Sequence, residues 1–195
     1  MTIRQPRAAL DAAILDIAAG LFAVRGFRGT SVQSVADATG YSKGAILARF
    51  SSKEQLFNAV VDRCVAMAAD LSASVEDLPE GPDRDARAVA GFVDASMAHP
   101  GNGALLMAAI LSPDQEIRVA LDRATPHLWH MFGAEQDNAD AELDARLLAA
   151  DVLERRVRVV SALGGISAVV AATEAVPVPG MRALLASIAE KTLRG

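Results

Sequence analysis

The most informative pattern of apolar and polar positions lies in residues 30–50, TSVQSVADATGYSKGAILARF. Gly40 stands where a first short helix needs a left-handed residue at its end, and Ser42 can cap a second helix by accepting a hydrogen bond from a later backbone N–H. The inward positions on both helices fit helical spacing; they are Val32, Val35, Ala36, Ile46 and Phe50. The pattern predicts a helix-turn-helix.

The outer face of the second predicted helix lacks the acidic and long polar side chains of an ordinary solvated helix. It consists of small, apolar or basic residues, namely Lys43, Gly44, Ala45, Leu47, Ala48 and Arg49. A face of this kind can lie against DNA.

Similar periodic patterns predict helices along the rest of the chain. A helix that begins near residue 7 is stopped by Gly26, and the order SSKE at residues 51–54 fits a capping box that starts another helix. Pro126 should kink or split the helix to which it belongs. About nine helices are expected in all; beside the helix-turn-helix they span 7–25, 53–74, 86–98, 102–111, 114–132, 140–174 and 181–193.

The composition agrees with an all-α fold. Hydrophobic residues make up 52% of the 195, yet the chain has only six Phe, one Tyr and one Trp, and Ala-, Leu- and Val-rich runs recur at helical spacing. The one cysteine, Cys64, excludes an intrachain disulfide framework. Because it lies in an apolar series, we expect it to be a small core residue.

The charge is divided unevenly between the two ends of the chain. Residues 1–57 carry seven Lys/Arg and four Asp/Glu, a net +3, whereas the remainder carries 12 and 20, a net −8, which gives the overall −5. Phosphate neutralisation needs local positive charge, so any contact with a polyanion belongs to the basic end. We therefore expect a DNA-binding helix-turn-helix domain over residues 1–52 and a helical ligand-binding and dimerisation domain over 53–195.

The sequence favours a cytoplasmic location and no membrane contact. Asp11 and Asp16 interrupt the N-terminal apolar pattern, so it lacks the core of a signal peptide. The uncharged run at residues 159–173 is shorter than the ~20 apolar residues that a spanning helix needs.

Residues 10–60 resemble the tetracycline-repressor (TetR) family of bacterial transcriptional regulators. The resemblance is carried by ILDIAAGLFAVRGFRGTSV and SVADATGYSKGAILARFSSKEQLF, which match the family's spacing without a gap. The rest of the chain is similar only in architecture: it is acidic and helical, with a long penultimate helix and a short last one. The resemblance implies an all-α regulator that binds double-stranded operator DNA.

The resemblance also implies roles for individual residues. Thr30 and Ser31 look like phosphate contacts at the start of the first helix of the motif. Lys53 looks like a phosphate clamp at the start of the helix that follows the motif. The expected groove contacts at the start of the recognition helix are Ser42, Lys43, Gly44 and Ala45.

Leu47 departs from the family, which usually has a Tyr there whose hydroxyl contacts a phosphate. Leu47 cannot make that bond, although it can touch a thymine methyl group. Arg49, expected at the next outward position, can replace the lost contact. Because the predicted recognition helix has few long polar side chains to contact base edges, its preference for a DNA sequence can depend on DNA shape.

The predicted C-terminal domain contains apolar residues that could bind an effector. A candidate pocket among its helices comprises Phe92, Met97, Leu106, Met107, Trp129 and Phe132, and each of these residues can instead be ordinary core. His127 and His130 share one helix face, but no close Cys, Asp or Glu completes a metal set, so neither a metal nor a cofactor is expected. Arg155, Arg156 and Arg158 are expected on a solvated or interface face.

The overall hypothesis is a homodimeric repressor that a small apolar effector releases from its operator. The last two helices would pair with their twofold mates, and the tentative interface residues are Gly164, Gly165, Leu184 and Ile188. No nucleophile–base motif or phosphate loop is visible, so an enzyme is not expected. The alternative is a helical small-molecule binding protein with a degenerate DNA-binding head.

Overall fold

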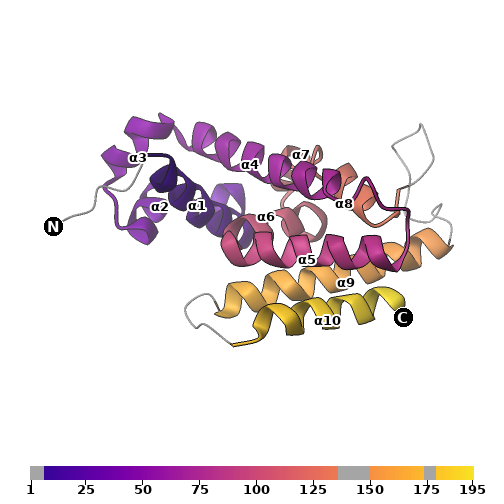
Figure 1. The fold of residues 1–195 in the computed structure, drawn as a ribbon. Helices are drawn as coiled ribbons and strands as arrows, with labels where there is room; N and C mark the ends of the chain where they lie inside the picture. The colour runs from indigo at the N-terminus through magenta and orange to yellow at the C-terminus, as the bar shows by residue number, and fades with distance from the viewer. Residues whose placement is uncertain (1–6, 136–149, 174–178) are drawn as a thin grey trace.

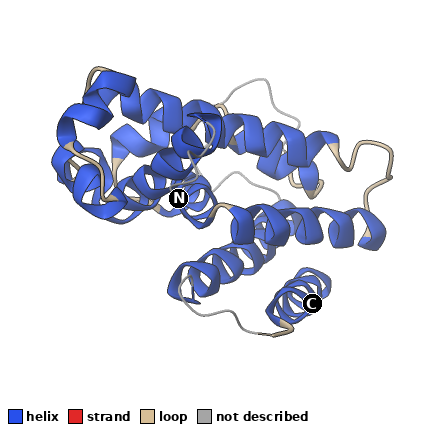
Figure 2. Cartoon of the chain, turned by 60° about the vertical axis from the view of Figure 1, so that its left-hand side comes forward, coloured by secondary structure: helices blue, strands red, loops and turns tan. Residues whose placement is uncertain are grey.

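The computed structural model describes residues 7–135, 150–173 and 179–195, in which helices are joined by loops and turns and no strand is present (Figure 2). The all-α prediction is confirmed. Ten helices are present in the described ranges: α1 (Arg7–Gly29), α2 (Val32–Thr39), α3 (Lys43–Phe50), α4 (Lys53–Ala73), α5 (Pro82–Ala98), α6 (Pro100–Leu111), α7 (Gln115–Ala120), α8 (Thr125–Met131), α9 (Ala150–Thr173) and α10 (Met181–Arg194).

The helix predicted over residues 114–132 is two helices, α7 and α8, which accounts for the tenth. Pro126 lies in the first turn of α8 rather than in the middle of a longer helix. Pro82 and Pro100 likewise begin α5 and α6, each some residues before the predicted start. Proline fits the first turn because the N–H that it lacks has no partner within the helix there.

Glycine and serine set the limits of the N-terminal helices. Gly26 interrupts α1 with φ 71° and ψ 174°, at the predicted stop. The cap of α4 is Ser52, whose hydroxyl accepts from Gln55 N–H at 3.2 Å. The capping box predicted for residues 51–54 is therefore wrong by one position: Ser51, with φ 58°, ends α3 instead. Part of the helix predicted over 140–174 lies outside the described residues.

The helices form a basic head and a longer body (Figure 1). Helices α1, α2 and α3 lie at one end, α4 runs from the head along the body, and α9 and α10 lie side by side at the opposite face from α4. One apolar core joins α1–α4 to α6 and α7, and a second joins α4–α6 to α8–α10. The division between residues 52 and 53 stays a prediction, and the first core draws side chains from both sides of it.

Helix α9 is long and apolar enough, by length and composition alone, to cross a membrane. Its inner side belongs to the second core through Val159, Leu163, Ile166 and Val170, each at most 3% exposed. Packing against α5, α6 and α10 accounts for that apolar side within the fold.

Candidate nucleic-acid interface

Helices α2 and α3 are joined by a tight turn at the tip of the head. Gly40 ends α2 in the left-handed conformation, with φ 74° and ψ 9°, which a residue with a side chain adopts at a cost. The Ser42 hydroxyl then accepts from Ala45 N–H at 3.1 Å and begins α3. This geometry leaves the first turn of α3 at the surface, with Ser42, Lys43 and Gly44 exposed and Ala45 half-buried.

The start of α3 suits close approach by another molecule. A Cβ added at Gly44 would find Ser42 Oγ at 3.9 Å as its one near neighbour among the described residues. Lys43 adds a positive charge beside this open backbone, and the N-terminus of a helix favours anions. Ser31, the cap of α2, is also exposed, and its hydroxyl accepts from Ser34 N–H at 3.0 Å.

Thr30 does not lie where the sequence analysis expects it. Its side chain is buried, and its hydroxyl lies 3.1 Å from the Leu21 carbonyl and 2.9 Å from the Gly26 carbonyl, either of which can accept its proton. The residue thus closes the turn between α1 and α2. The expected phosphate contact from the Thr30 side chain is corrected, because that hydroxyl is inside the head.

Arg49 is also oriented differently from the expectation. Its guanidinium forms an ion pair with Asp11 of α1, and its side chain is 23% exposed. The pair fastens α3 to α1 and neutralises the charge that was expected to replace the missing tyrosine contact. Leu47 packs partly buried against the first core, so it offers only part of its surface.

Tyr41 is a candidate contact that sequence reasoning missed. It lies in the turn immediately before Ser42 and is 39% exposed. A phenolic hydroxyl can donate to a phosphate oxygen. The signal for it in the sequence is that the chain's one tyrosine directly precedes the cap Ser42, in GYSKG.

Lys53 is held in place by an aromatic ring. Its Nζ lies 4.1 Å from the centroid of Phe27, which stacks on Phe22 and packs at a tilt against Phe57 in the first core. The cation–π contact orients the ammonium group at the start of α4. Lys53 therefore keeps the position expected of a phosphate clamp.

The body residues assigned to a pocket mostly fill the core instead. Phe92, Leu106, Met107 and Phe132 are at most 3% exposed and belong to the second core, whereas Met97 is 40% exposed. Trp129 borders a shallow groove with Val157 and Val160. Four of the six side chains are therefore part of the core, and the pocket itself stays a prediction.

Two arginines of α9 make hydrogen bonds and an ion pair within the chain, whereas a solvated or interface face was expected for them. Arg155 donates to the Phe132 carbonyl at 2.9 Å and pairs with Asp85 at 2.5 Å, and Arg156 donates to the Ala134 carbonyl at 2.9 Å. These two arginines hold the end of α8 against α9. His130 pairs with Glu135, and no group of three or more metal-ligating side chains occurs within 7–135, 150–173 and 179–195.

Three hydrogen bonds that each use a backbone group tie the head to the body over long sequence distances. Arg63 of α4 donates to the Ala12 carbonyl at 2.9 Å, and Asn102 N–H of α6 donates to Asp16 Oδ1 at 3.1 Å. Phe27 N–H donates to Asp114 Oδ2 at 2.9 Å. No local pattern in the sequence indicates these contacts, because their partners lie 51 to 87 positions apart.

The sequence model of the family described as "Bacterial regulatory proteins, tetR family" matches residues 14–60, which include α2, α3 and the start of α4. Residues 14–60 thus carry the N-terminal domain of the TetR family. A stretch of 48 residues is 46% identical to the HTH-type transcriptional repressor KstR2 of Rhodococcus jostii. The match covers 25% of this chain and spans about a quarter of that relative, 24% of its length.

Solved structures show that the whole chain has the fold of TetR-like proteins. A TetR-like transcriptional regulator from Rhodococcus sp. RHA1 aligns with a TM-score of 0.57 and 23% identity over 98% of this chain and 100% of its own. A putative fatty acid metabolism regulator of Clostridium perfringens aligns with a TM-score of 0.61 and 16% identity, over 94% of this chain and 97% of its own. FadR from Bacillus subtilis, in complex with stearoyl-CoA, aligns with a TM-score of 0.54 and 13% identity, over 93% of this chain and 94% of its own.

Proposed function

We propose that this chain is a homodimeric transcriptional repressor of the TetR family that binds operator DNA through α2 and α3 and is released by a small-molecule effector. The observation that carries the proposal is the exposed start of α3, with Lys43 beside the open backbone of Gly44, inside the domain that matches the family. The related stretch of KstR2 belongs to a protein named as a repressor, which favours repression over activation. We place the protein in the cytoplasm, where such DNA is found.

The proposed DNA contacts are of two kinds. Ser31, Tyr41 and Lys53 would bind phosphates and set the position of the head, since polar side chains and helix N-termini commonly do so. The first turn of α3 would enter the major groove through Ser42, Lys43, Gly44 and Ala45, with the exposed part of Leu47 against a thymine methyl. Arg49 would act indirectly, by holding α3 on α1 through Asp11.

The proposed dimer forms through the outer sides of α9 and α10. Leu184 and Ile188 are 60% and 53% exposed on α10, and Val157 is 56% exposed on α9. Gly165 is open, with no other atom within 4 Å of an added Cβ in the described structure, so a second helix can approach closely there. Two α9–α10 pairs would make a four-helix interface. The two α3 helices would then address half-sites one turn, ~34–36 Å, apart.

Release would follow from the way the body holds the head. Helix α4 belongs to both cores, and α6 packs against α1 on one side and α9 on the other. An effector that fits another arrangement of α4 and α6 better would move the heads apart or together. Coupling of ~1–3 kcal/mol changes operator affinity by about 5- to 150-fold, which is enough for a switch. FadR of Bacillus subtilis, seen with stearoyl-CoA, supports an effector with an apolar part.

The test begins with selection of genomic fragments that the full-length protein retains at low salt. Fluorescence anisotropy then measures affinity for an enriched duplex and for a scrambled duplex between 50 and 200 mM salt. A head that makes 6–10 phosphate contacts loses about 10³- to 10⁵-fold in affinity over this range. We expect that steep dependence together with preference for the enriched duplex. Failure to retain any DNA at low salt would instead support the alternative, a small-molecule binding protein with a degenerate head.

A further inference from the structure

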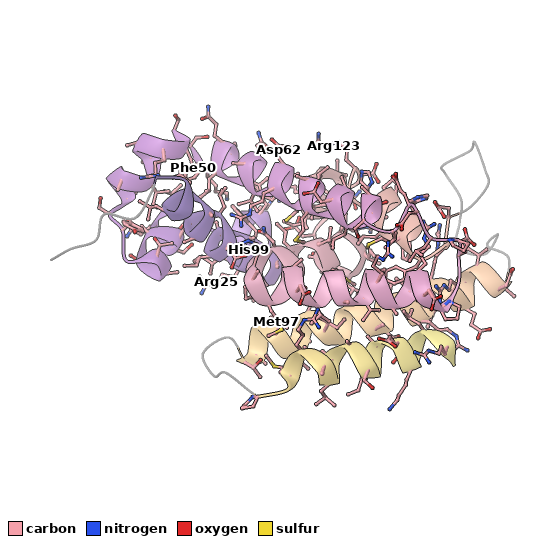
Figure 3. The ribbon with its side chains drawn as sticks, viewed as in Figure 1. Arg25, Phe50, Asp62, Met97, His99 and Arg123 are labelled. Carbon is pink, nitrogen blue, oxygen red and sulfur yellow. The ribbon has the colours of Figure 1, made fainter. Side chains whose placement is uncertain are left out.

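A groove of about 390 Å³ lies between α4, α5 and the start of α6, where the body meets the head. Its floor and walls include Arg63, Met67, Leu71, Ala95, His99 and Asn102. Figure 3 places His99 at the head-proximal end of α5, beside α1. The groove differs from the apolar set expected from sequence, because charged and amide groups line it together with apolar ones.

Asn102 is the most informative side chain in this groove. It is 1% exposed, and neither its amide nitrogen nor its amide oxygen has a hydrogen-bond partner among the described residues. Its backbone is well placed without the side chain, since its N–H donates to Asp16. A buried amide without a partner costs free energy, so an apolar residue of similar size would stabilise the fold better. A molecule that enters the groove would supply the hydrogen bonds that this amide lacks.

The charges in the groove are arranged along α4. Arg63 donates one N–H to the Ala12 carbonyl, and this is its one hydrogen bond in the described structure. The other N–H groups of its planar guanidinium are therefore available to an acceptor. Asp70 lines the same groove seven residues further along α4, about 10 Å away at 1.5 Å per residue. Met67 lies between them on the same helix face. The head-proximal end thus favours an anion, the middle favours apolar groups, and the distal end disfavours a second anion.

We propose that this groove binds a small monocarboxylate, with the carboxylate at Arg63, His99 and Asn102 and the apolar part along Met67 and Leu71. Arg63 is suited to a carboxylate because its fork donates two parallel hydrogen bonds, and the Asn102 amide donates a third. The inference deepens the proposed function, on which it rests, by naming the class of effector. It also places that effector on the residue that ties α4 to α1.

The test uses octanoate as the probe, with octanamide and octanedioate as matched eight-carbon molecules. The full-length protein carries ¹³C-methyl methionine, and the Met67 signal is identified among the six methionines by Met67→Leu. We expect octanoate to shift the Met67 signal to saturation. Octanamide should bind more weakly because it lacks the charge, and octanedioate because its second carboxylate meets Asp70. Absence of a saturable shift, or equal affinity for all three probes, would overturn the proposal.

Variants separate the groove from unspecific binding. Arg63→Gln and Asn102→Leu should each weaken octanoate about tenfold or more, the range for a lost charge-assisted or buried hydrogen bond. The matched controls are Arg123→Gln and Asn58→Ala, which change an exposed arginine and an exposed asparagine outside the groove. Figure 3 shows Arg123 beside Asp62 on the outer side of α4. Equal losses in the controls would show adsorption at the surface and would contradict the groove.

Thermal unfolding without octanoate separates a ligand role for Asn102 from a structural one. Asn102→Leu should unfold at the same temperature as the parent protein or higher, because the unpaired amide is gone. A clearly lower midpoint would overturn the assignment of Asn102. DNA retention measured on the same samples keeps this inference distinct from the proposed function: DNA binding without octanoate binding refutes only the effector class, and the reverse refutes only the regulator.

Discussion

The carboxylate of Asp114 joins the body to the head through the backbone of Phe27, whose N–H donates to Asp114 Oδ2 at 2.9 Å. The other oxygen, Oδ1, accepts from Glu116 N–H at 2.9 Å and caps α7. Gly26 is required beside this contact, since an added Cβ would lie 2.3 Å from Asp114 Oδ2. One side chain thus begins a body helix and fixes the α1–α2 junction that carries the candidate DNA-binding surface.

Replacing Asp114 tests this double role. Asp114→Ala should lower the free energy of unfolding by ~2–3 kcal/mol, because it removes a helix cap and a hydrogen bond to a charged group. Asp114→Ser keeps a cap for α7 but is too short to reach Phe27, so it should lose about half of that amount. Urea denaturation followed by circular dichroism measures both. An Asp114→Ser protein as stable as the parent protein would show that the link to Phe27 contributes nothing.

Gly101 marks the closest approach of α6 to α1. A Cβ at this position would come within 1.8 Å of the Asp16 carbonyl oxygen. Gly101→Ala should therefore force α6 away from α1 and cost several kcal/mol, at the upper end for single substitutions. The control lies across the same contact: a Cβ at Gly20 meets Gly101 Cα at 3.6 Å, an ordinary distance.

Gly20→Ala should leave the stability unchanged or raise it by up to ~1 kcal/mol, because alanine has the higher helix propensity. The midpoints of thermal unfolding of the two variants give the comparison. If Gly101→Ala were as stable as Gly20→Ala, the tight packing of α6 on α1 would be refuted.

The proposed dimer surface predicts a change of mass. Leu184→Glu combined with Ile188→Glu places charges on the exposed side of α10 and should convert a dimer into a monomer that remains helical. Val24→Glu alters a valine that is 83% exposed in the head and should leave the dimer intact. Sedimentation equilibrium measures the mass of each variant. A double variant that stays dimeric would place the interface elsewhere.

The burial of Cys64 in the first core predicts a pH dependence of stability. Burial raises the pKa of its thiol from 9.0 to about 12, so the folded protein keeps the thiol neutral where an exposed cysteine would ionise. The resulting stabilisation is complete below pH 9 and is lost as the pH rises from 9 towards 12, because only the unfolded chain ionises there. Reaction with Ellman's reagent at pH 8 should be far slower in native protein than in urea. Similar rates would contradict the burial of Cys64.

The local parts of this structure could be predicted from sequence, whereas the distant ones could not. Gly40 and Ser42 set the turn of the helix-turn-helix through contacts within a few residues, and the prediction there is confirmed. Arg49 was expected at the surface because its partner Asp11 is 38 positions away and on another helix. Thr30 was misplaced for a similar reason, since burial of its hydroxyl depends on how α1 ends at Gly26.

The body shows the same limit. The apolar set around Phe92 has the spacing of both a core and a pocket, and only packing distinguishes them. Asn102 gave no sequence signal, because its unpaired amide is defined by burial under α4 and α5. The dimer residues and the division into two domains remain predictions that the experiments above address.

The most direct measurement of the central claim is the salt dependence of operator binding by Lys43→Ala. In a dimer Lys43→Ala removes two positive charges at the α3 helices, so operator affinity should fall at every salt concentration, and the slope of log affinity against log salt should become less steep by up to about 2, the value reached if each lysine also neutralises a phosphate. Arg123→Ala, which removes an exposed arginine far from α3, should leave both quantities unchanged. A Lys43→Ala protein that binds operator DNA with the parent affinity and slope would contradict the assignment of α3 as the reading helix.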